Sequence, residues 1–260
     1  MMGCSFVRLS TPRPGGLFPG SAITPGVSDE DVPTGSAALD TLLGGGFERG
    51  TVTQLYGPPG SGKTNVALSA AVEAAAAGGG ALIIDTEGLS LDRFDQVLSG
   101  RVEDVEAVSS SIILTEAHDF AEQAEAVKDA AEFAERIDLV VLDSATGFYR
   151  IKRTEDEEAG DALRQVANQV THLLSLARKH DLAAVITNQV YTDPETETER
   201  TRPLGGHTLT HWTGTVLRLD RFKGGNRRAT LEKHRAKAEG ESARFKITGE
   251  GIEDAERGTR

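Results

Sequence analysis

The chain has 260 residues, and its 40 acidic and 28 basic side chains give a formal net charge of −12. An apolar fraction of 38% and 29 glycines exclude a collagen-like, coiled-coil or fully disordered chain. No apolar run reaches the roughly 18 residues of a membrane-spanning helix. We therefore expect no membrane partner. Because the single cysteine, Cys4, has no partner for an internal disulfide, we also expect a cytoplasmic protein.

The basic residues are mostly arginine, with 20 Arg and 8 Lys. An acidic, lysine-poor composition is typical of halophilic proteins, which work in concentrated salt; an ordinary acidic cytosolic protein is the alternative. At molar salt the Debye length is about 3 Å, so any nucleic-acid contact would act only at close range.

The N-terminal segment is rich in Pro, Gly and Ser and has no hydrophobic periodicity, which predicts a disordered extension over residues 1–32. Order is expected to begin near Val32, with a short helix over residues 37–43 that ends at glycines 44–46. We assign residues 33–250 to one core and residues 251–260 to a tail.

Apolar strands and helices then alternate along the chain. Strands are expected at residues 51–56, 81–85, 111–115, 139–143 and 182–187. Helices are expected at residues 63–77, 91–98, 120–136 and 161–180. This alternation predicts an α/β fold with a mostly parallel central sheet flanked by helices. Three later strands, at 213–220, 228–234 and 243–248, are joined by short turns and predict a C-terminal antiparallel β meander.

The strongest motif lies between the first strand and the first long helix. It fits G-x-x-x-x-G-K-[ST] and consists of Gly57, Pro58, Pro59, Gly60, Ser61, Gly62, Lys63 and Thr64. Its glycines let backbone N–H groups surround a β-phosphate at the positive end of the helix dipole. We expect Lys63 to reach the β- and γ-phosphates and Thr64 to bind Mg²⁺, so the predicted cofactors are ATP and Mg²⁺.

Polar residues follow three other predicted strands. Asp143 closes an apolar strand, where it can hold the Mg²⁺ shell beside the P-loop. Glu87 stands where a carboxylate can orient or deprotonate an attacking water, although Asp85 or Thr86 could instead make this segment a helix cap. Gln189 stands where an amide can sense a γ-phosphate, with a simple strand-terminating turn as the alternative.

These segments together resemble the RecA/RadA recombinase family from Pro33 to about Gly251. The matching segments are Asp85-Thr86-Glu87-Gly88, Asp143-Ser144-Ala145-Thr146-Gly147-Phe148-Tyr149-Arg150, Ile186-Thr187-Asn188-Gln189-Val190 and Pro203-Leu204-Gly205-Gly206-His207. The resemblance implies a RecA-type P-loop ATPase core. It also implies that Lys63 and Glu87 serve catalysis and that Gln189 couples the nucleotide state to DNA binding.

The chain also departs from RadA. With so few residues before Pro33, we expect no N-terminal helical DNA-binding domain. Neither Phe6-Val7-Arg8-Leu9 nor Phe18-Pro19-Gly20-Ser21 fits the Phe-x-x-Ala polymerisation motif. The proline of the family's ATP cap is missing from residues 236–240. This pattern resembles the short, core-only archaeal paralogues of RadA.

Such a paralogue is expected to be an ATP-binding and DNA-binding mediator of homologous recombination and DNA repair. The resemblance implies weak ATPase activity that DNA does not stimulate, and no strand exchange by the chain itself. It implies contacts with a RadA-like recombinase and with a Holliday-junction resolvase, and hence an influence on the cleavage of branched DNA.

Two basic regions are candidates for contact with single-stranded or branched DNA. The first contains Arg150, Lys152 and Arg153 beside aromatic residues, but the acidic run 155–158 follows it. The second is the segment 221–237, with seven basic side chains against one acidic; a solvated basic hairpin is the alternative. Within it we favour DNA contact for Arg221, Lys223, Arg227 and Arg228.

Lys233 and Arg235 lie two apart on a predicted strand and so face the same side. In related RecA-type and KaiC-type ATPases such a pair reaches the γ-phosphate of the neighbouring subunit, so an inter-subunit finger and a DNA contact both stay open here.

Three rival functions remain. The first is an active, DNA-stimulated ATPase that forms filaments, and the second is a nucleotide-gated adaptor without turnover. The third is a KaiC-like signalling ATPase, which glycines 44–46 favour and the segment 85–88 opposes.

Overall fold

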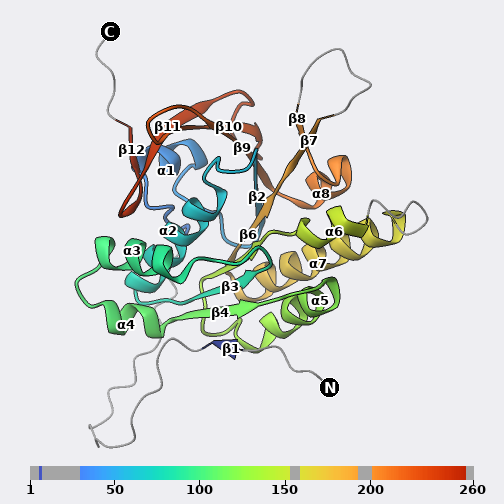
Figure 1. Ribbon diagram of the computed structural model, residues 1–260, viewed down its shortest axis with the longest axis horizontal. Coiled ribbons are helices and arrows are strands. Elements are labelled where there is room, and N and C mark those ends of the chain that lie inside the picture. The colour runs from blue at the N-terminus through green and yellow to red at the C-terminus, as the bar shows by residue number, and fades with distance from the viewer. Residues whose placement is uncertain (1–5, 8–29, 153–158, 193–200, 256–260) are drawn as a thin grey trace, which may run out of the picture.

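The computed structural model describes residues 6–7, 30–152, 159–192 and 201–255, and it is built around one large sheet with helices on both faces (Figure 1). In spatial order the strands of this sheet are β1 (Phe6–Val7), β4 (Ile112–Glu116), β3 (Ala81–Asp85), β5 (Leu139–Asp143), β6 (Ala183–Asn188), β2 (Val52–Tyr56), β9 (Thr215–Arg221), β10 (Asn226–Lys233), β11 (Ser242–Thr248) and β12 (Gly251–Asp254). From β4 to β9 the neighbours are parallel, whereas β1 and β10 to β12 pair antiparallel. The predicted mostly parallel sheet and its antiparallel C-terminal meander are confirmed.

The helices divide between the two faces of the sheet. One face carries α1 (Ala37–Leu43), α2 (Lys63–Ala76), α3 (Leu91–Arg101) and α4 (Val105–Ser110). The other carries α5 (Phe120–Asp129), the 3-10 turn Ala130–Glu132, α6 (Gly147–Lys152), α7 (Ala159–His180) and α8 (Gly206–Trp212). A separate pair, β7 (Val190–Thr192) and β8 (Thr201–Pro203), projects from the end of β6 beside α8 (Figure 1).

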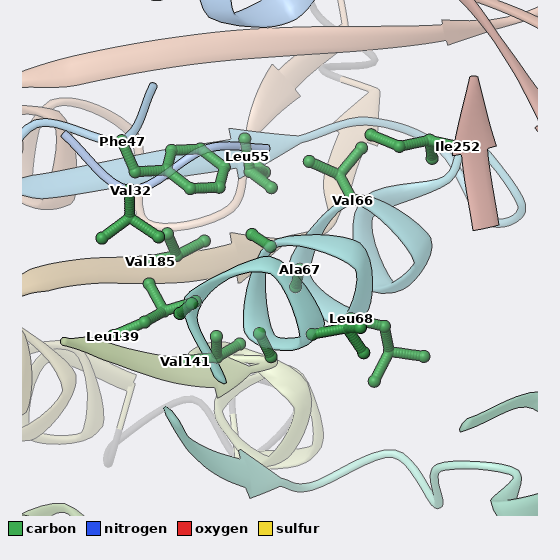
Figure 2. Close-up of a cluster of buried hydrophobic side chains, with 14 of the residues drawn as sticks. Val32, Phe47, Leu55, Val66, Ala67, Leu68, Leu139, Val141, Val185 and Ile252 are labelled. Carbon is green, nitrogen blue, oxygen red and sulfur yellow. The ribbon is translucent and has the colours of Figure 1, made fainter. Parts of the chain in front are cut away.

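Two hydrophobic cores form because side chains alternate across each strand. Leu139 and Val141 of β5 pack on the α2 side, and Val140 and Leu142 on the α7 side. Figure 2 shows the α2 side of the sheet, where the helix faces side chains of β2, β5 and β6. Both faces are therefore covered, and the polar ends of the strands gather at the carboxyl edge of the sheet.

Several short elements of the fold are not predicted by the hydrophobic pattern of the sequence. The predicted helix 120–136 ends at Asp129, because i→i+3 bonds such as Phe133 N to Ala130 O tighten the chain there. Helices α4, α6 and α8 have six, six and seven residues, too few for a clear 3.6-residue period. Strands β7, β8 and β12 have only three, three and four residues, and they pair with β8, β7 and β11 respectively.

The observed ends of the core lie outside the predicted boundaries at 33 and 250. Val32 is buried and exchanges two backbone hydrogen bonds with Phe47, at 3.0 and 2.7 Å, and β1 pairs with β4 inside the segment expected to be disordered. At the other end β12 lies within the segment expected to be a tail, and Ile252 is fully buried opposite Ile247.

Within the described ranges, no helix combines the length and apolar character needed to cross a membrane.

Candidate nucleotide-binding site

The P-loop joins β2 to α2. Glycine is required at two of its positions, at one because of the backbone conformation and at the other because a neighbouring strand lies too close for a side chain. Gly62 has φ +104°, a left-handed conformation that side chains disfavour. At Gly57 a Cβ atom would lie 2.3 Å from the carbonyl oxygen of Leu219, so the loop can lie directly against β9. Gly62 caps α2 without a side-chain hydrogen bond, which leaves first-turn N–H groups able to bind a phosphate.

Lys63 lies inside the loop that it is predicted to serve. Its Nζ donates to the carbonyl oxygens of Gly57 at 2.9 Å and Pro58 at 3.3 Å, and only 8% of the residue is exposed. Burial lowers the pKa of Lys63, while the carboxylates of Asp143 and Glu87 oppose this shift. A phosphate in the loop would replace two weak carbonyl acceptors with a charged one, which is the stronger partner for an ammonium group.

Thr64 and Asp143, the predicted Mg²⁺ ligands, lie together at the carboxyl edge of the sheet. The Thr64 hydroxyl hydrogen-bonds to the Asp143 carboxylate, and the two residues line one small cavity with Asp85. Burial raises the pKa of Asp143; hydrogen bonds from Thr187 and Thr64 oppose this rise. The charges of Glu87 and Asp85 raise the pKa further.

This donor set fits a magnesium ion. Mg²⁺ is usually bound by one or two carboxylates together with waters and substrate phosphates, rather than by a cage of protein ligands. A cation beside Asp143 would also offset the unfavourable burial of that carboxylate. Among the described residues, no three His, Cys, Asp or Glu side chains lie close enough together to hold a metal by themselves.

Glu87 and Gln189, the predicted catalytic carboxylate and sensor, are in direct contact. Glu87 Oε1 accepts hydrogen bonds from Gln189 Nε2 at 2.8 Å and from Ser144 Oγ at 2.9 Å. The Glu87 side chain is solvent-exposed, so water can reach its carboxylate. Ser144 was not a candidate from the sequence, although its position directly after Asp143 at the same strand end was the available signal.

Asp85 and Thr86 shape the segment that carries Glu87. The Asp85 carboxylate accepts from the backbone N–H groups of Glu87, at 3.0 Å, and of Leu89. Thr86 Oγ1 donates to the Ser144 carbonyl at 3.0 Å and accepts from the Ser144 N–H at 2.9 Å. Asp85 therefore closes the turn that holds Glu87 at the mouth of the site. The alternative of a helix cap at Asp85 or Thr86 is wrong, because Ser90 is the N-cap of α3.

Lys233 and Arg235 do not share a strand face. Strand β10 ends at Lys233, after a register shift at Leu231, so Arg235 lies beyond it. Lys233 Nζ donates to the carbonyl oxygens of Thr210 and Thr213, at 2.7 and 2.6 Å, at the end of α8. Arg235 forms an ion pair with Glu48 at 2.8 Å.

The candidate DNA contacts lie in two separate places. Arg150 and Lys152 belong to α6, whose side chains there are not described, and Arg153 with the acidic run 155–158 lies outside the described residues. The other set lies on the β9–β10 hairpin, where an open groove is lined by Arg221, Phe222, Lys223, Gly224, Gly225 and Arg227.

The hairpin cations differ in their surroundings. Arg228 is paired with Asp220 at 2.8 Å. Arg227 is 92% buried, and its NH1 group donates to the carbonyl oxygen of Asn226 at 2.8 Å. Burial lowers the pKa of Arg227, and the neighbouring Arg221 lowers it further. Arg221 and Lys223 are exposed and form no ion pair with any residue in the described part of the chain.

The site combines a P-loop after β2, a buried carboxylate at the end of β5, two strands from β2, and a carboxylate–amide pair beside it. On a parallel sheet that ends in an antiparallel meander, this arrangement defines a RecA-type P-loop ATPase core. The family model described as Rad51 matches residues 30–255, and the chain belongs to this family.

Its relatives include proteins named "DNA repair and recombination protein RadB". The one from Halobacterium salinarum is 68% identical over 87% of this chain and 96% of its own length. The one from Archaeoglobus fulgidus is 41% identical over 85% of this chain and 97% of its own length. A crystal structure described as the RadB recombinase matches 86% of this chain and all of its own, with a TM-score of 0.75 and 38% identity.

Proposed function

We propose that this chain is an ATP-gated, DNA-binding accessory protein of recombination and repair that hydrolyses ATP slowly. The observation that carries the proposal is the convergence of Lys63, Thr64, Asp143, Glu87 and Gln189 at one edge of the sheet. The names of the relatives support a role in DNA repair and recombination.

ATP with Mg²⁺ is the nucleotide that this site fits. The backbone N–H groups of the P-loop and Lys63 would hold the phosphates, while Thr64 and Asp143 would hold the metal. Bound Mg²⁺ would neutralise phosphate charge and orient the terminal phosphate. Glu87 would then orient the attacking water, and Gln189 would contact the γ-phosphate.

The Glu87–Gln189 contact supports gating and slow turnover. Gln189 Nε2 donates to Glu87 Oε1, and Ser144 donates to the same oxygen. A γ-phosphate would compete with Glu87 for the Gln189 amide, which donates to Glu87 through Nε2 in this structure. ATP would therefore both move the sensor and release the carboxylate, which joins nucleotide recognition to a change at the end of β6. Hydrolysis would wait for that rearrangement.

The β9–β10 hairpin is the DNA contact that we favour. Arg221 and Lys223 present charge without a neutralising carboxylate among the described residues, and Phe222, 48% exposed, can stack on a base. The hairpin also lies against the P-loop, since a Cβ at Gly60 would be 3.0 Å from Arg221 NH1. Arg150, Lys152 and Arg153, the first of the two basic regions, remain candidates for DNA contact.

The complete catalytic set favours a second candidate, a DNA-stimulated filament ATPase. A RadA-like recombinase remains the protein partner that we propose, and a Holliday-junction resolvase a further one. A cytoplasmic, halophilic setting fits the Halobacterium relative.

Measurement of ATP hydrolysis in molar KCl, with and without single-stranded DNA, distinguishes the accessory protein from the DNA-stimulated filament ATPase. For the accessory role we expect turnover barely above that of the Lys63→Ala and Glu87→Gln variants, with no response to DNA. Nucleotide should nevertheless change DNA affinity in a fluorescence anisotropy titration. Stimulation of ten-fold or more, about 1.4 kcal/mol of barrier, would favour the filament ATPase. Failure of the wild-type protein to bind ATP would refute both.

A further inference from the structure

Asn188 ends β6 between the two residues that reach the nucleotide site, yet its own side chain points elsewhere. It is fully buried and joins two segments that are far apart in the sequence. Its Oδ1 accepts from Thr146 Oγ1 at 2.6 Å, and its Nδ2 donates to the carbonyl oxygen of Leu204 at 2.7 Å. The Leu204 carbonyl can only accept, so these two partners fix the orientation of the amide.

Backbone hydrogen bonds reinforce both junctions. The N–H of Ala145 donates to the carbonyl of Thr187 at 3.0 Å, and the N–H of Leu204 donates to the carbonyl of Gln189 at 2.9 Å. Leu204 is thus held twice, through its N–H and its carbonyl, by neighbouring residues of one strand end. Thr146 directly precedes α6, and Leu204 lies two residues before α8.

The residues on either side of Asn188 contact the site itself. Thr187 Oγ1 donates to the buried carboxylate of Asp143, and Gln189 Nε2 donates to Glu87. Adjacent Cα atoms are only about 3.8 Å apart, so a displacement of the Gln189 backbone towards a phosphate would move the Asn188 backbone as well. Thr146 and Leu204 are bonded to the Asn188 amide and would follow.

We propose that Asn188 is a positioning residue that ties the starts of α6 and α8 to the nucleotide site, so that both helices respond together when ATP binds. The inference rests on the proposed function in one respect, which is that the ligand of the site is ATP. It assigns a role to a residue that contacts neither the nucleotide loop nor the catalytic carboxylate.

Three substitutions separate the two arms of this link. Thr146→Val keeps the shape of the side chain and removes only the hydroxyl that Asn188 accepts. Asn188→Asp keeps an acceptor for Thr146 but places an oxygen against the Leu204 carbonyl. Asn188→Ala removes both arms. Thr115→Val is the matched control, because Thr115 is also buried on a strand, while its hydroxyl has no partner within the described structure.

The assay is amide hydrogen exchange of the full chain in molar KCl, with and without Mg·AMP-PNP. In the wild type and in Thr115→Val we expect the nucleotide to change exchange in both Gly147–Lys152 and Gly206–Trp212. Thr146→Val should lose the response in α6 alone, Asn188→Asp in α8 alone, and Asn188→Ala in both. Binding of a fluorescent ATP analogue should stay within about three-fold of the wild type, because the hydrogen-bond partners of the Asn188 side chain, Thr146 and Leu204, lie outside the P-loop.

An unchanged response of both helices in Asn188→Ala would overturn the inference. Equal loss in both helices for Thr146→Val would also overturn it, because the link would then have no separate arms. The exchange readout needs no DNA, so a protein that binds no DNA would refute the proposed DNA role and leave this inference standing. A wild type that binds Mg·AMP-PNP without any response in α6 and α8 would refute the inference and leave ATP binding intact.

Discussion

Asp85 on β3 and Asp143 on β5 stand opposite each other in the parallel register, yet the same substitution should affect them in opposite directions. The Asp85 carboxylate accepts two backbone N–H groups, those of Glu87 and Leu89. Among the described residues, the Asp143 carboxylate accepts from side-chain hydroxyl groups alone, and burial raises its pKa. One carboxylate is thus used by the fold, whereas the other is buried at a cost to the fold and is the one that we propose for a cation.

The magnitudes follow from these partners. Asp85→Asn leaves one oxygen for two N–H donors and replaces a charge-assisted bond, which should cost about 1–2 kcal/mol. Asp143→Asn removes a buried charge but keeps an oxygen for one hydroxyl donor, which should stabilise the metal-free protein by about 1–2 kcal/mol. For a chain of this size each kcal/mol shifts Tm by roughly 2–4 °C.

Thermal unfolding in molar KCl with a chelator and no nucleotide measures both effects. Tm should rise for Asp143→Asn and fall for Asp85→Asn. The ordinary carboxyl pKa is 3.8, and the folded value of Asp143 lies above it, so the cost of its charge is complete at high pH. This cost fades as the pH falls through the folded pKa towards 3.8, because the native state then takes up the proton first. The advantage of Asp143→Asn should therefore shrink as the pH is lowered from 8.

Addition of Mg·ATP should reverse the order of the wild type and Asp143→Asn. A ligand that binds only the folded state raises Tm in proportion to the logarithm of its concentration over Kd, and the variant lacks the metal ligand. A lower Tm for Asp143→Asn in the chelator, or an equal gain from Mg·ATP in both proteins, would refute the assignment of Asp143 to the metal.

Two further predictions concern the basic side chains. Lys233→Met should lower Tm by about 2–4 °C, because methionine keeps the stem but loses both bonds to the end of α8, whereas exposed Lys128→Met should leave it unchanged. A normal Tm with lost ATPase activity would instead support the inter-subunit finger. Arg221→Gln should reduce the salt dependence of single-stranded DNA binding by about 0.7 in log–log slope, and the double variant Arg228→Gln/Asp220→Asn, which removes a neutralised pair, should change it little. Equal effects of the two changes in anisotropy titrations would contradict this difference.

The sequence predicts the parallel part of the fold well because each central strand is an apolar run with a clear boundary. The five residues of β5, for example, are all buried, and the run ends at Asp143. The P-loop is predicted well for a similar reason. Its glycines and lysine form a short motif whose conformation depends on its own backbone and on the helix that directly follows it. Sequence reasoning therefore placed Lys63, Asp143 and Glu87 at the same edge of the sheet.

Contacts between distant segments were beyond the same reasoning. Nothing local to Asn188 indicates that its amide meets Leu204, sixteen residues later, or that Thr146 lies on its other side. Strand β12 is four residues long and joins the core because Ile252 packs against residues far earlier in the chain. These elements are specified by packing, which no short window of sequence contains.

A count of charged residues along the sequence overestimates how cationic the surface of the segment 221–237 is. The segment 221–237 carries seven basic side chains and one acidic side chain, which suggests a strongly cationic surface. In the folded chain Arg228 and Arg235 are paired with carboxylates outside that count, and Lys233 is held by backbone carbonyls. A surface reduced to a few free cations gains little from long-range attraction in concentrated salt, where charges are screened beyond about 3 Å. The DNA contact that we propose for this hairpin would then depend on close approach, and the exposed ring of Phe222 between Arg221 and Lys223 provides a surface for it.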